Sequence, residues 1–219
     1  MRARPSVALA PRMSVRLEQK QQTRNALLDA ARHLIESGRG LSSISLREVA
    51  RAAGIVPTGF YRHFADMDEL GLALVNEVGD TFRDAIRLVR HNELILGGLT
   101  DASVDIFLQA VDAHRSHFVF LAREQYGGSQ KVRLGLARLR QAISSDLAVD
   151  LAGMPRWEHL TREALEIMAD LVVKTVFATL PELIDPPGAS AFAGQAPREK
   201  IRQQLRLIFM GGRHWVGAP

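Results

Sequence analysis

The chain has 219 residues, of which 47% are hydrophobic and 24% charged, a balance typical of a soluble globular protein of one or two domains. It contains no cysteine, which excludes disulfides, thiolate metal sites and a cysteine nucleophile. No apolar run approaches the roughly twenty residues that span a bilayer, and the basic N-terminus lacks the apolar core of a signal peptide. These features predict a cytoplasmic protein without membrane insertion. Clustered glycines and few aromatic residues disfavour an all-β fold, and we predict an all-α one.

Positive charge is concentrated in the first third of the chain. Residues 1–64 contain eleven Lys and Arg against four Asp and Glu, whereas the remainder contains seventeen basic and twenty acidic residues. Such an asymmetry is the electrostatic footprint of nucleic-acid binding, although a membrane-surface or solubility function would also use a basic segment.

The N-terminal segment predicts a tail followed by a long helix. Residues 1–14 contain two prolines and no periodicity, and we assign them to a disordered arm. A helix is expected from about Arg16 to Ser37, with Lys20 and Arg24 near its start as candidate phosphate contacts. Its apolar stripe is Leu27, Ala30, Ala31, Leu34 and Ile35.

The stretch from residue 45 to residue 64 predicts two short helices joined by a tight turn. Ser45 and Glu48 form a capping box that opens the first helix. Gly54 ends this helix, and Pro57 occupies the position where the next one begins. Together with the preceding long helix, these elements form a three-helix domain over residues 15–66.

The second of these short helices has two different faces. Phe60 and Phe64 are four residues apart and share the inward face. The outer face carries hydroxyls, a guanidinium, an imidazole and a glycine, which are groups that contact phosphates and base edges in the major groove. The unit is therefore a helix-turn-helix candidate, although helix–glycine–helix corners also occur in ordinary all-α proteins. Candidate DNA-binding residues are Lys20, Arg24, Ser45, Arg47, Thr58, Gly59, Tyr61, Arg62 and His63.

The pattern S-x-R-E-V-A-x-x-A-G-I-x-x-x-x-F-Y-R-H-F-x-x-x-x-E-L, over residues 45–70, resembles the DNA-binding domain of TetR-type bacterial repressors. Within that family, the string PTGFYRHFADMDELGLALV (residues 57–75) is most similar to the FabR-like and DesT-like branch, which represses unsaturated fatty acid synthesis and acyl desaturases. Met67 stands where the family usually carries a phosphate-binding lysine, and this branch tolerates an apolar residue there. The resemblance implies a repressor whose ligand is a long-chain acyl-CoA.

The rest of the chain, residues 67–219, predicts a helical effector-binding and dimerisation domain. Asp66 and Glu69 form a capping box that opens a helix to about Arg90, long enough to connect both domains. Further helices are expected at about 101–114, 117–125, 130–151 and 157–180, a loop at 181–197, and a last helix from Pro197. The wide apolar faces of the last two helices predict a homodimer built as a four-helix bundle. Such a dimer would read an inverted repeat in double-stranded DNA.

The effector site has the weakest sequence signal. The candidate effector-binding residues are Phe107, Phe118, Leu121 and Phe177, which could equally be plain core. Arg115 or Arg123 could meet a coenzyme A phosphate or face solvent. The pair His114 and His117 lacks the third ligand that zinc needs, as does His159 with Glu163, so we predict no metal and no cofactor.

No nucleophile elbow, phosphate-binding loop or H-E-x-x-H motif is present, and we predict that the protein is not an enzyme. Two alternatives remain open at this stage. An acyl-CoA enzyme or lipid carrier could use the same helical domain. A repressor of an efflux or catabolic gene could respond to another hydrophobic molecule, such as a drug or an aromatic compound.

Overall fold

The structure is a computed structural model that describes residues 10–96, 101–185 and 195–216. Within these ranges it contains helices and no strand, which confirms the all-α prediction. The helices are α1 (Ala10–Glu36), η1 (Leu41–Ser43), α2 (Leu46–Ala52), α3 (Pro57–Phe60), α4 (Met67–Leu96), α5 (Asp101–Ala113), α6 (Arg115–Glu124), α7 (Gln130–Ala152), η2 (Pro155–Trp157), α8 (Arg162–Ile184) and α9 (Gln195–Arg213).

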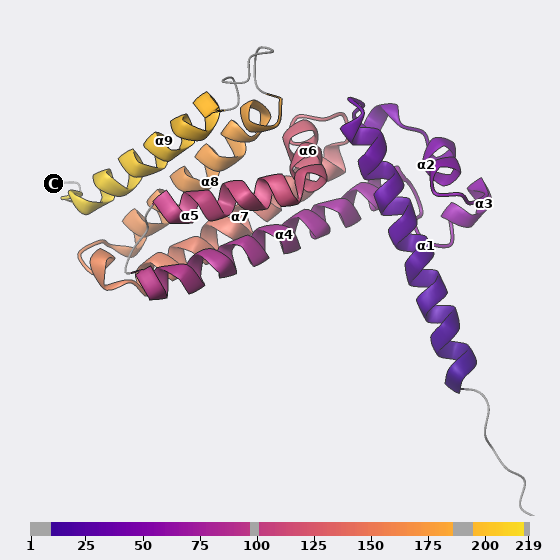
Figure 1. Ribbon diagram of the computed structural model, residues 1–219, viewed down its shortest axis with the longest axis horizontal. Helices are drawn as coiled ribbons and strands as arrows, with labels where there is room; N and C mark the ends of the chain where they lie inside the picture. The colour runs from indigo at the N-terminus through magenta and orange to yellow at the C-terminus, as the bar shows by residue number, and fades with distance from the viewer. Residues whose placement is uncertain (1–9, 97–100, 186–194, 217–219) are drawn as a thin grey trace, which may run out of the picture.

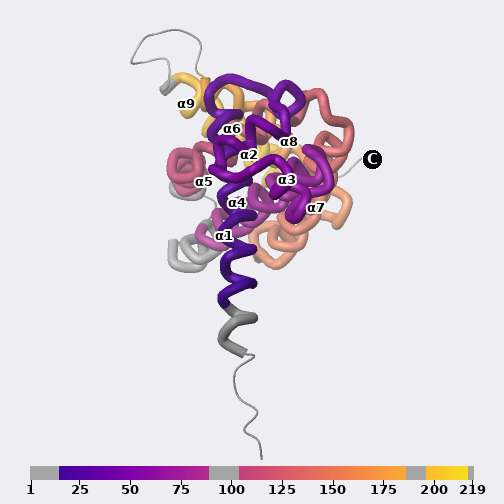
Figure 2. The backbone as a smooth tube through the Cα atoms, turned by 90° about the vertical axis from the view of Figure 1, so that its right-hand side faces the viewer, coloured from indigo at the N-terminus to yellow at the C-terminus, as the bar shows by residue number. Residues whose placement is uncertain are grey.

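The helices form two groups joined by α4. Figure 1 shows α1, α2 and α3 at one end of the molecule, α5–α9 at the other, and α4 running from the first group along the second. In the view onto the first group (Figure 2), α1 extends away from the rest of the molecule. Helix α6 packs against α1, α4 and α8, and α7 packs against α4 and α8. The small N-terminal domain therefore rests on α4 and α6.

The helix-turn-helix forms as its capping residues predict. Ser45 caps α2 in a complete capping box with Glu48. Gly54 has a φ of 72°, a left-handed conformation that glycine adopts without strain, and it turns the chain after α2. Pro57 lies in the first turn of α3, where its missing N–H leaves no hydrogen bond unmade. Helix α3 ends at Phe60, before the predicted end near Phe64, and residues 61–63 form turns.

Helix α1 begins at Ala10 rather than at the predicted Arg16. It therefore takes in residues 10–14 of the segment assigned to a disordered arm, while residues 1–9 of that arm lie outside the described residues. Pro11 does not prevent this longer helix, because the first turn has no intrahelical partner for its N–H groups.

Helix α4 opens with a variant of the predicted capping box. The Asp66 carboxylate accepts the Glu69 N–H at 2.7 Å, as expected. The Glu69 side chain accepts the N–H of Ala65 rather than that of Asp66. The helix then runs to Leu96, past the predicted end near Arg90. The predicted break at Gly97 and Gly98 lies outside the described residues.

Two boundaries around α8 differ from the prediction. Trp157 belongs to η2, and α8 begins only at Arg162, because the Thr161 hydroxyl accepts the Ala164 N–H and caps the helix there. At the other end α8 continues through Pro181 to Ile184, although we predicted a loop from Pro181.

The continuation through Pro181 has a local explanation. A proline inside a helix leaves the carbonyl of the residue four positions earlier without its N–H donor. That residue is Phe177, and the Gln125 side chain at the end of α6 donates to its carbonyl at 3.4 Å. A tertiary contact thus replaces the hydrogen bond that proline removes, and sequence periodicity cannot reveal it.

Helices α4 and α7 approach each other closely through glycines. A Cβ at Gly71 of α4 would lie 2.6 Å from side-chain atoms of Leu41 and Val132, and one at Gly135 of α7 would lie 2.8 Å from Leu72. Both distances are below van der Waals contact, so only glycine allows this separation. The crossing fixes α4 against α7, beside η1.

Candidate DNA-binding surface and effector core

The predicted DNA-binding side chains lie around α3. The rings of Phe60 and Phe64 are fully buried with their centroids 5.6 Å apart, and they anchor α3 on the core of the N-terminal domain. Tyr61 is 64% exposed, and its ring packs edge-on against Phe60. Thr58 and Arg62 are also exposed, and Gly59 is half-buried. The face opposite the two phenylalanines is therefore polar and accessible.

Two cationic side chains of α1 and one from the turn after α3 converge on His63. Burial lowers the pKa of His63, and the positive charges of Lys20, Arg24 and Arg62 lower it further. The Arg24 guanidinium lies 4.8 Å from the centroid of the Phe64 ring, a cation–π distance that holds it beside α3. The structure thus brings the predicted residues of α1 and α3 together, although they are about 40 positions apart in the sequence. A phosphate would neutralise this charge.

The predicted contacts of α2 differ in their surroundings. Arg47 is exposed. The Ser45 hydroxyl donates to Glu48 Oε2 at 2.8 Å and accepts the Glu48 N–H at 3.3 Å, so it already serves as the helix cap. Arg39, which the motif did not indicate, donates to Glu48 Oε1 at 2.7 Å. This Arg39 hydrogen bond, followed by those of the Ser45 backbone and hydroxyl, lowers the pKa of Glu48 to about 2.

The candidate effector residues gather in the core of the second domain. Phe82 of α4 contacts three of the predicted side chains, with ring centroids 5.2 Å from Phe118, 5.4 Å from Phe177 and 6.1 Å from Phe107. The Phe82 and Phe177 rings are stacked, with an interplanar angle of 27°. Leu121, one helical turn after Phe118, is fully buried. We call the four rings the aromatic cluster; Phe82 is not among the candidates that the sequence indicates.

Helix α6 also binds the N-terminal domain through polar contacts. Arg123 donates to the Ile35 carbonyl at the end of α1. The Glu124 carboxylate, only 1% exposed, accepts the Leu41 N–H at 2.7 Å. Burial raises the pKa of Glu124, while the Leu41 hydrogen bond and the Arg123 charge act in the opposite direction. The end of α6 is thus attached to both α1 and η1.

The two arginines considered for a coenzyme A phosphate have protein partners. Arg115 donates to the Ile184 carbonyl at 2.8 Å, at the end of α8. Arg123 lies 3.4 Å from the Asp185 carboxylate, in addition to its bond to α1. Both therefore brace α6 against α8.

The histidine pairs also have protein contacts. The rings of His114 and His117 are stacked with centroids 5.9 Å apart, and His117 bonds to Arg32 and Thr81. His159 bonds to the Gly212 carbonyl at 3.1 Å. Among the described residues, no three His, Cys, Asp or Glu side chains are grouped as a metal ion would require.

An apolar groove lies on the face formed by α8 and α9. Ile167 and Leu171 of α8 and Leu207 and Met210 of α9 are large, exposed hydrophobic side chains. All but Met210 line the groove. Such a patch usually marks an interaction surface. No helix in the described ranges is long and apolar enough to cross a membrane.

Fold and surface together define a class: an all-α protein with a basic helix-turn-helix domain joined by a long helix to a second helical domain. Two family models match it. Residues 27–74 match the bacterial regulatory proteins of the tetR family, and residues 96–211 match the tetracyclin repressor-like C-terminal domain. The second match covers more than half of the chain, and the chain belongs to the TetR family of transcriptional regulators.

Solved structures share this fold. A TetR-family regulator from Syntrophomonas wolfei is 13% identical with a TM-score of 0.67, and the match covers 90% of this chain and 97% of that one. NalD, the secondary repressor of the MexAB-OprM multidrug efflux pump in Pseudomonas aeruginosa, is 20% identical with a TM-score of 0.59, over 89% and 99%. FadR, a fatty acid degradation regulator from Bacillus halodurans, is 13% identical with a TM-score of 0.57, over 83% and 93%. At these identities the likeness concerns the fold.

Proposed function

We propose that this regulator is a ligand-responsive repressor that binds an inverted-repeat operator as a homodimer. The observation that carries the proposal is the convergence of Lys20, Arg24 and Arg62 on His63, beside the exposed Tyr61. A cationic surface with hydroxyl donors on an anchored helix suits phosphate and base-edge contacts in the major groove. Ser45, Arg47, Thr58 and Gly59 complete the proposed surface.

Operator binding tests this surface directly. Tyr61→Ala and Arg62→Ala should each weaken binding to an inverted repeat from the gene's own upstream region by about 1–3 kcal/mol. Fluorescence anisotropy at fixed salt measures the Kd. Arg87→Ala is the matched control, because it removes one exposed arginine of α4 whose ion pair is with Asp84. An unchanged Kd in both variants would refute the assignment of Tyr61 and Arg62 to the DNA-binding surface.

The dimer is proposed to form through the apolar groove of α8 and α9. A pair of such helices from each protomer would make a four-helix bundle and would bury the exposed Leu171 and Leu207. Leu171→Glu should convert the protein to monomers in analytical ultracentrifugation, because a carboxylate in that interface would be desolvated without a partner. A dimer that persists in this variant would place the interface elsewhere.

The proposed effector is a long-chain acyl-CoA, and the proposed targets are genes of fatty acid synthesis or desaturation. The support is the resemblance of residues 57–75 to the branch that controls these genes, together with an apolar cluster on α4, α5, α6 and α8. Oleoyl-CoA and palmitoyl-CoA should shift operator affinity differently in the anisotropy titration. Indifference to both would remove this effector class and keep the repressor.

A second effector class has its own support. Arg115 donates to a backbone carbonyl, and Arg123 donates to a backbone carbonyl and pairs with Asp185. Neither arginine is therefore free to bind a coenzyme A phosphate. Four clustered phenylalanine rings also suit a planar aromatic molecule. A repressor of an efflux or catabolic gene that responds to such a compound is therefore the alternative. An aromatic compound that changes operator affinity where acyl-CoAs do not would favour it.

A further inference from the structure

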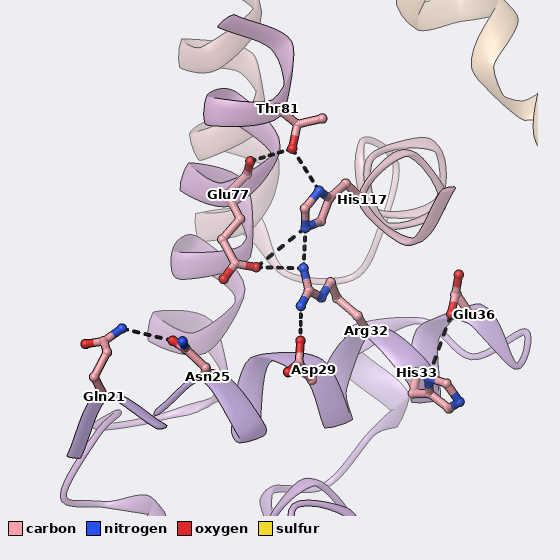
Figure 3. Close-up of polar contacts among 9 residues, drawn as sticks. All are labelled: Gln21, Asn25, Asp29, Arg32, His33, Glu36, Glu77, Thr81 and His117. Atoms are coloured by element: carbon pink, nitrogen blue, oxygen red, sulfur yellow. Dashed lines mark hydrogen bonds and ion pairs between the residues drawn. The ribbon is translucent and has the colours of Figure 1, made fainter. Parts of the chain in front are cut away.

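A chain of polar contacts joins α1, α4 and α6 where the two domains meet (Figure 3). Arg32 of α1 donates to His117 Nε2 of α6, and it also pairs with Asp29 and, at 3.2 Å, with Glu77 of α4. The other ring nitrogen of His117 lies 2.8 Å from the Thr81 hydroxyl of α4. Three helices from both domains thus meet at one imidazole.

The donors and acceptors of this chain specify one tautomer. A guanidinium can only donate, so His117 Nε2 must accept, and the ring proton must reside on Nδ1. Nδ1–H then donates to Thr81 Oγ1, whose own proton is directed at the Glu77 carbonyl at 3.1 Å. Burial, followed by the Arg32 charge, lowers the pKa of His117 to about 4, which keeps the ring neutral. We call this sequence of three bonds the relay.

The relay is adjacent to the aromatic cluster on two helices at once. Thr81 precedes Phe82 in α4, and His117 precedes Phe118 in α6. The Phe82 and Phe118 rings lie 5.2 Å apart. A molecule that separates these two rings by moving α4 and α6 apart would also change the position of His117 relative to Thr81. Arg32 would lose its acceptor, and α1 would lose a polar contact to α6.

We propose that the relay from Arg32 through His117 to Thr81 couples the aromatic cluster to the orientation of the helix-turn-helix domain. The proposal rests on the function proposed above, and it assigns positioning residues to the response of that function. In the intact relay, α1 is held in one orientation on α4 and α6. When the rings of the aromatic cluster separate, the hydrogen bonds of the relay break. The N-terminal domain can then change its orientation, which alters the separation of the two α3 helices in the dimer.

Thr81→Val tests the relay with little change in shape, because it removes only the hydroxyl that accepts the hydrogen bond from the imidazole N–H. The chain offers a matched control in Thr179 of α8, which is also buried and also donates to the carbonyl four residues earlier, at 2.8 Å. Thr179→Val therefore removes the same group from the same kind of helical site. Its hydroxyl has no role in the relay, so any difference between the two variants reports on His117.

The chain has no native cysteine, so Arg51→Cys on α2 and Ser145→Cys on α7, both exposed, accept two spin labels. The ligand-free, full-length protein is measured by double electron–electron resonance, diluted with unlabelled protein so that only distances within one protomer contribute. We expect Thr81→Val to broaden or shift the distance distribution and Thr179→Val to leave it unchanged. Identical distributions in the two variants would overturn the proposal.

The same variants are then titrated with operator DNA, with and without oleoyl-CoA. The fold-change in Kd caused by the ligand should fall about threefold or more in Thr81→Val and persist in Thr179→Val, as expected when a coupling free energy is lost. A wild-type protein that ignores oleoyl-CoA would reject the proposed effector. The distance measurement decides on the relay in either case, because it needs neither DNA nor ligand.

Discussion

The two domains carry their candidate functional residues in opposite environments. Around α3 the proposed DNA contacts Thr58, Tyr61 and Arg62 are exposed and need only a rigid support, which Phe60 and Phe64 provide from beneath. In the second domain Phe118, Leu121 and Phe177 are buried, so the same side chains form the core and the proposed effector site. The comparison teaches that binding and stability are separable in the first domain and inseparable in the second. Four experiments test this contrast.

The largest effect is expected when the support under the DNA-binding face is removed. Phe60→Ala should lower the free energy of unfolding of the N-terminal domain by about 3–5 kcal/mol, through lost burial and a cavity. Hydrogen exchange should show lost protection in α2 and α3 and unchanged protection in α8. The adjacent Tyr61→Ala, at an exposed side chain, should change stability by no more than about 0.5 kcal/mol. Similar losses in both variants would contradict the separation of support from contact.

The second experiment uses pH to test the buried imidazole between the domains. The His117 pKa of about 4 lies below the 6.5 of an unperturbed histidine, so between these pH values the unfolded chain binds a proton that the folded protein does not. The contribution of His117 is therefore complete above about pH 6.5 and falls as the pH approaches 4. The whole loss is at most about 3.4 kcal/mol, at 1.36 kcal/mol per pKa unit.

Urea unfolding from pH 7 to pH 4.5 measures this slope in the wild type and in His117→Gln. Glu77, whose pKa burial raises, has the opposite pH dependence, because its contribution is present at low pH and is lost as the pH rises through its folded pKa. It is present in both proteins, so their difference reports on His117 together with its ion pair to Glu77, 3.8 Å away. Parallel pH profiles would show that His117 titrates in the folded protein as it does in the unfolded chain.

The third experiment tests the close crossing that fixes α4 on the second domain. Gly71→Ala should lower the free energy of unfolding by about 1–3 kcal/mol, because the added Cβ would lie 2.6 Å from Leu41 and Val132. Gly59→Ala is the control in this DNA-free measurement, since the nearest atom to a Cβ there is 3.6 Å away, an ordinary contact. Thermal denaturation compares the two proteins. Equal stability would mean that α4 and α7 separate without penalty.

The smallest effect concerns a single phosphate contact. Lys20→Ala should weaken binding to all DNA sequences alike and should reduce the slope of log K against log [salt] by about 1. A series of anisotropy titrations at increasing salt measures the slope, with Arg87→Ala as the control for one lost surface charge. An unchanged slope would remove Lys20 from the proposed surface while leaving α3 in place.

Local chemistry explains where the sequence predicted the structure well. A capping box, a glycine with positive φ and a proline in the first helical turn act within a few residues, and each of them sets the helix-turn-helix as expected. The spacing of Phe60 and Phe64 likewise predicted that both rings are buried, although α3 ends at Phe60 and Phe64 lies after it. Local patterns did not predict the whole basic surface, because Lys20 and Arg24 come near His63 only once α1 has packed in the N-terminal domain.

The sequence by itself therefore determined the all-α class, the helix-turn-helix and the long connecting helix, because caps, turns and periodicity depend on neighbours along the chain. Tertiary structure alone decided that α8 continues through Pro181, that Phe82 is the centre of the aromatic cluster and that Arg32 meets His117 and Thr81. Each of these depends on a partner at least 25 positions away. The energy of such a contact exists only once the helices have packed, and no local pattern encodes it.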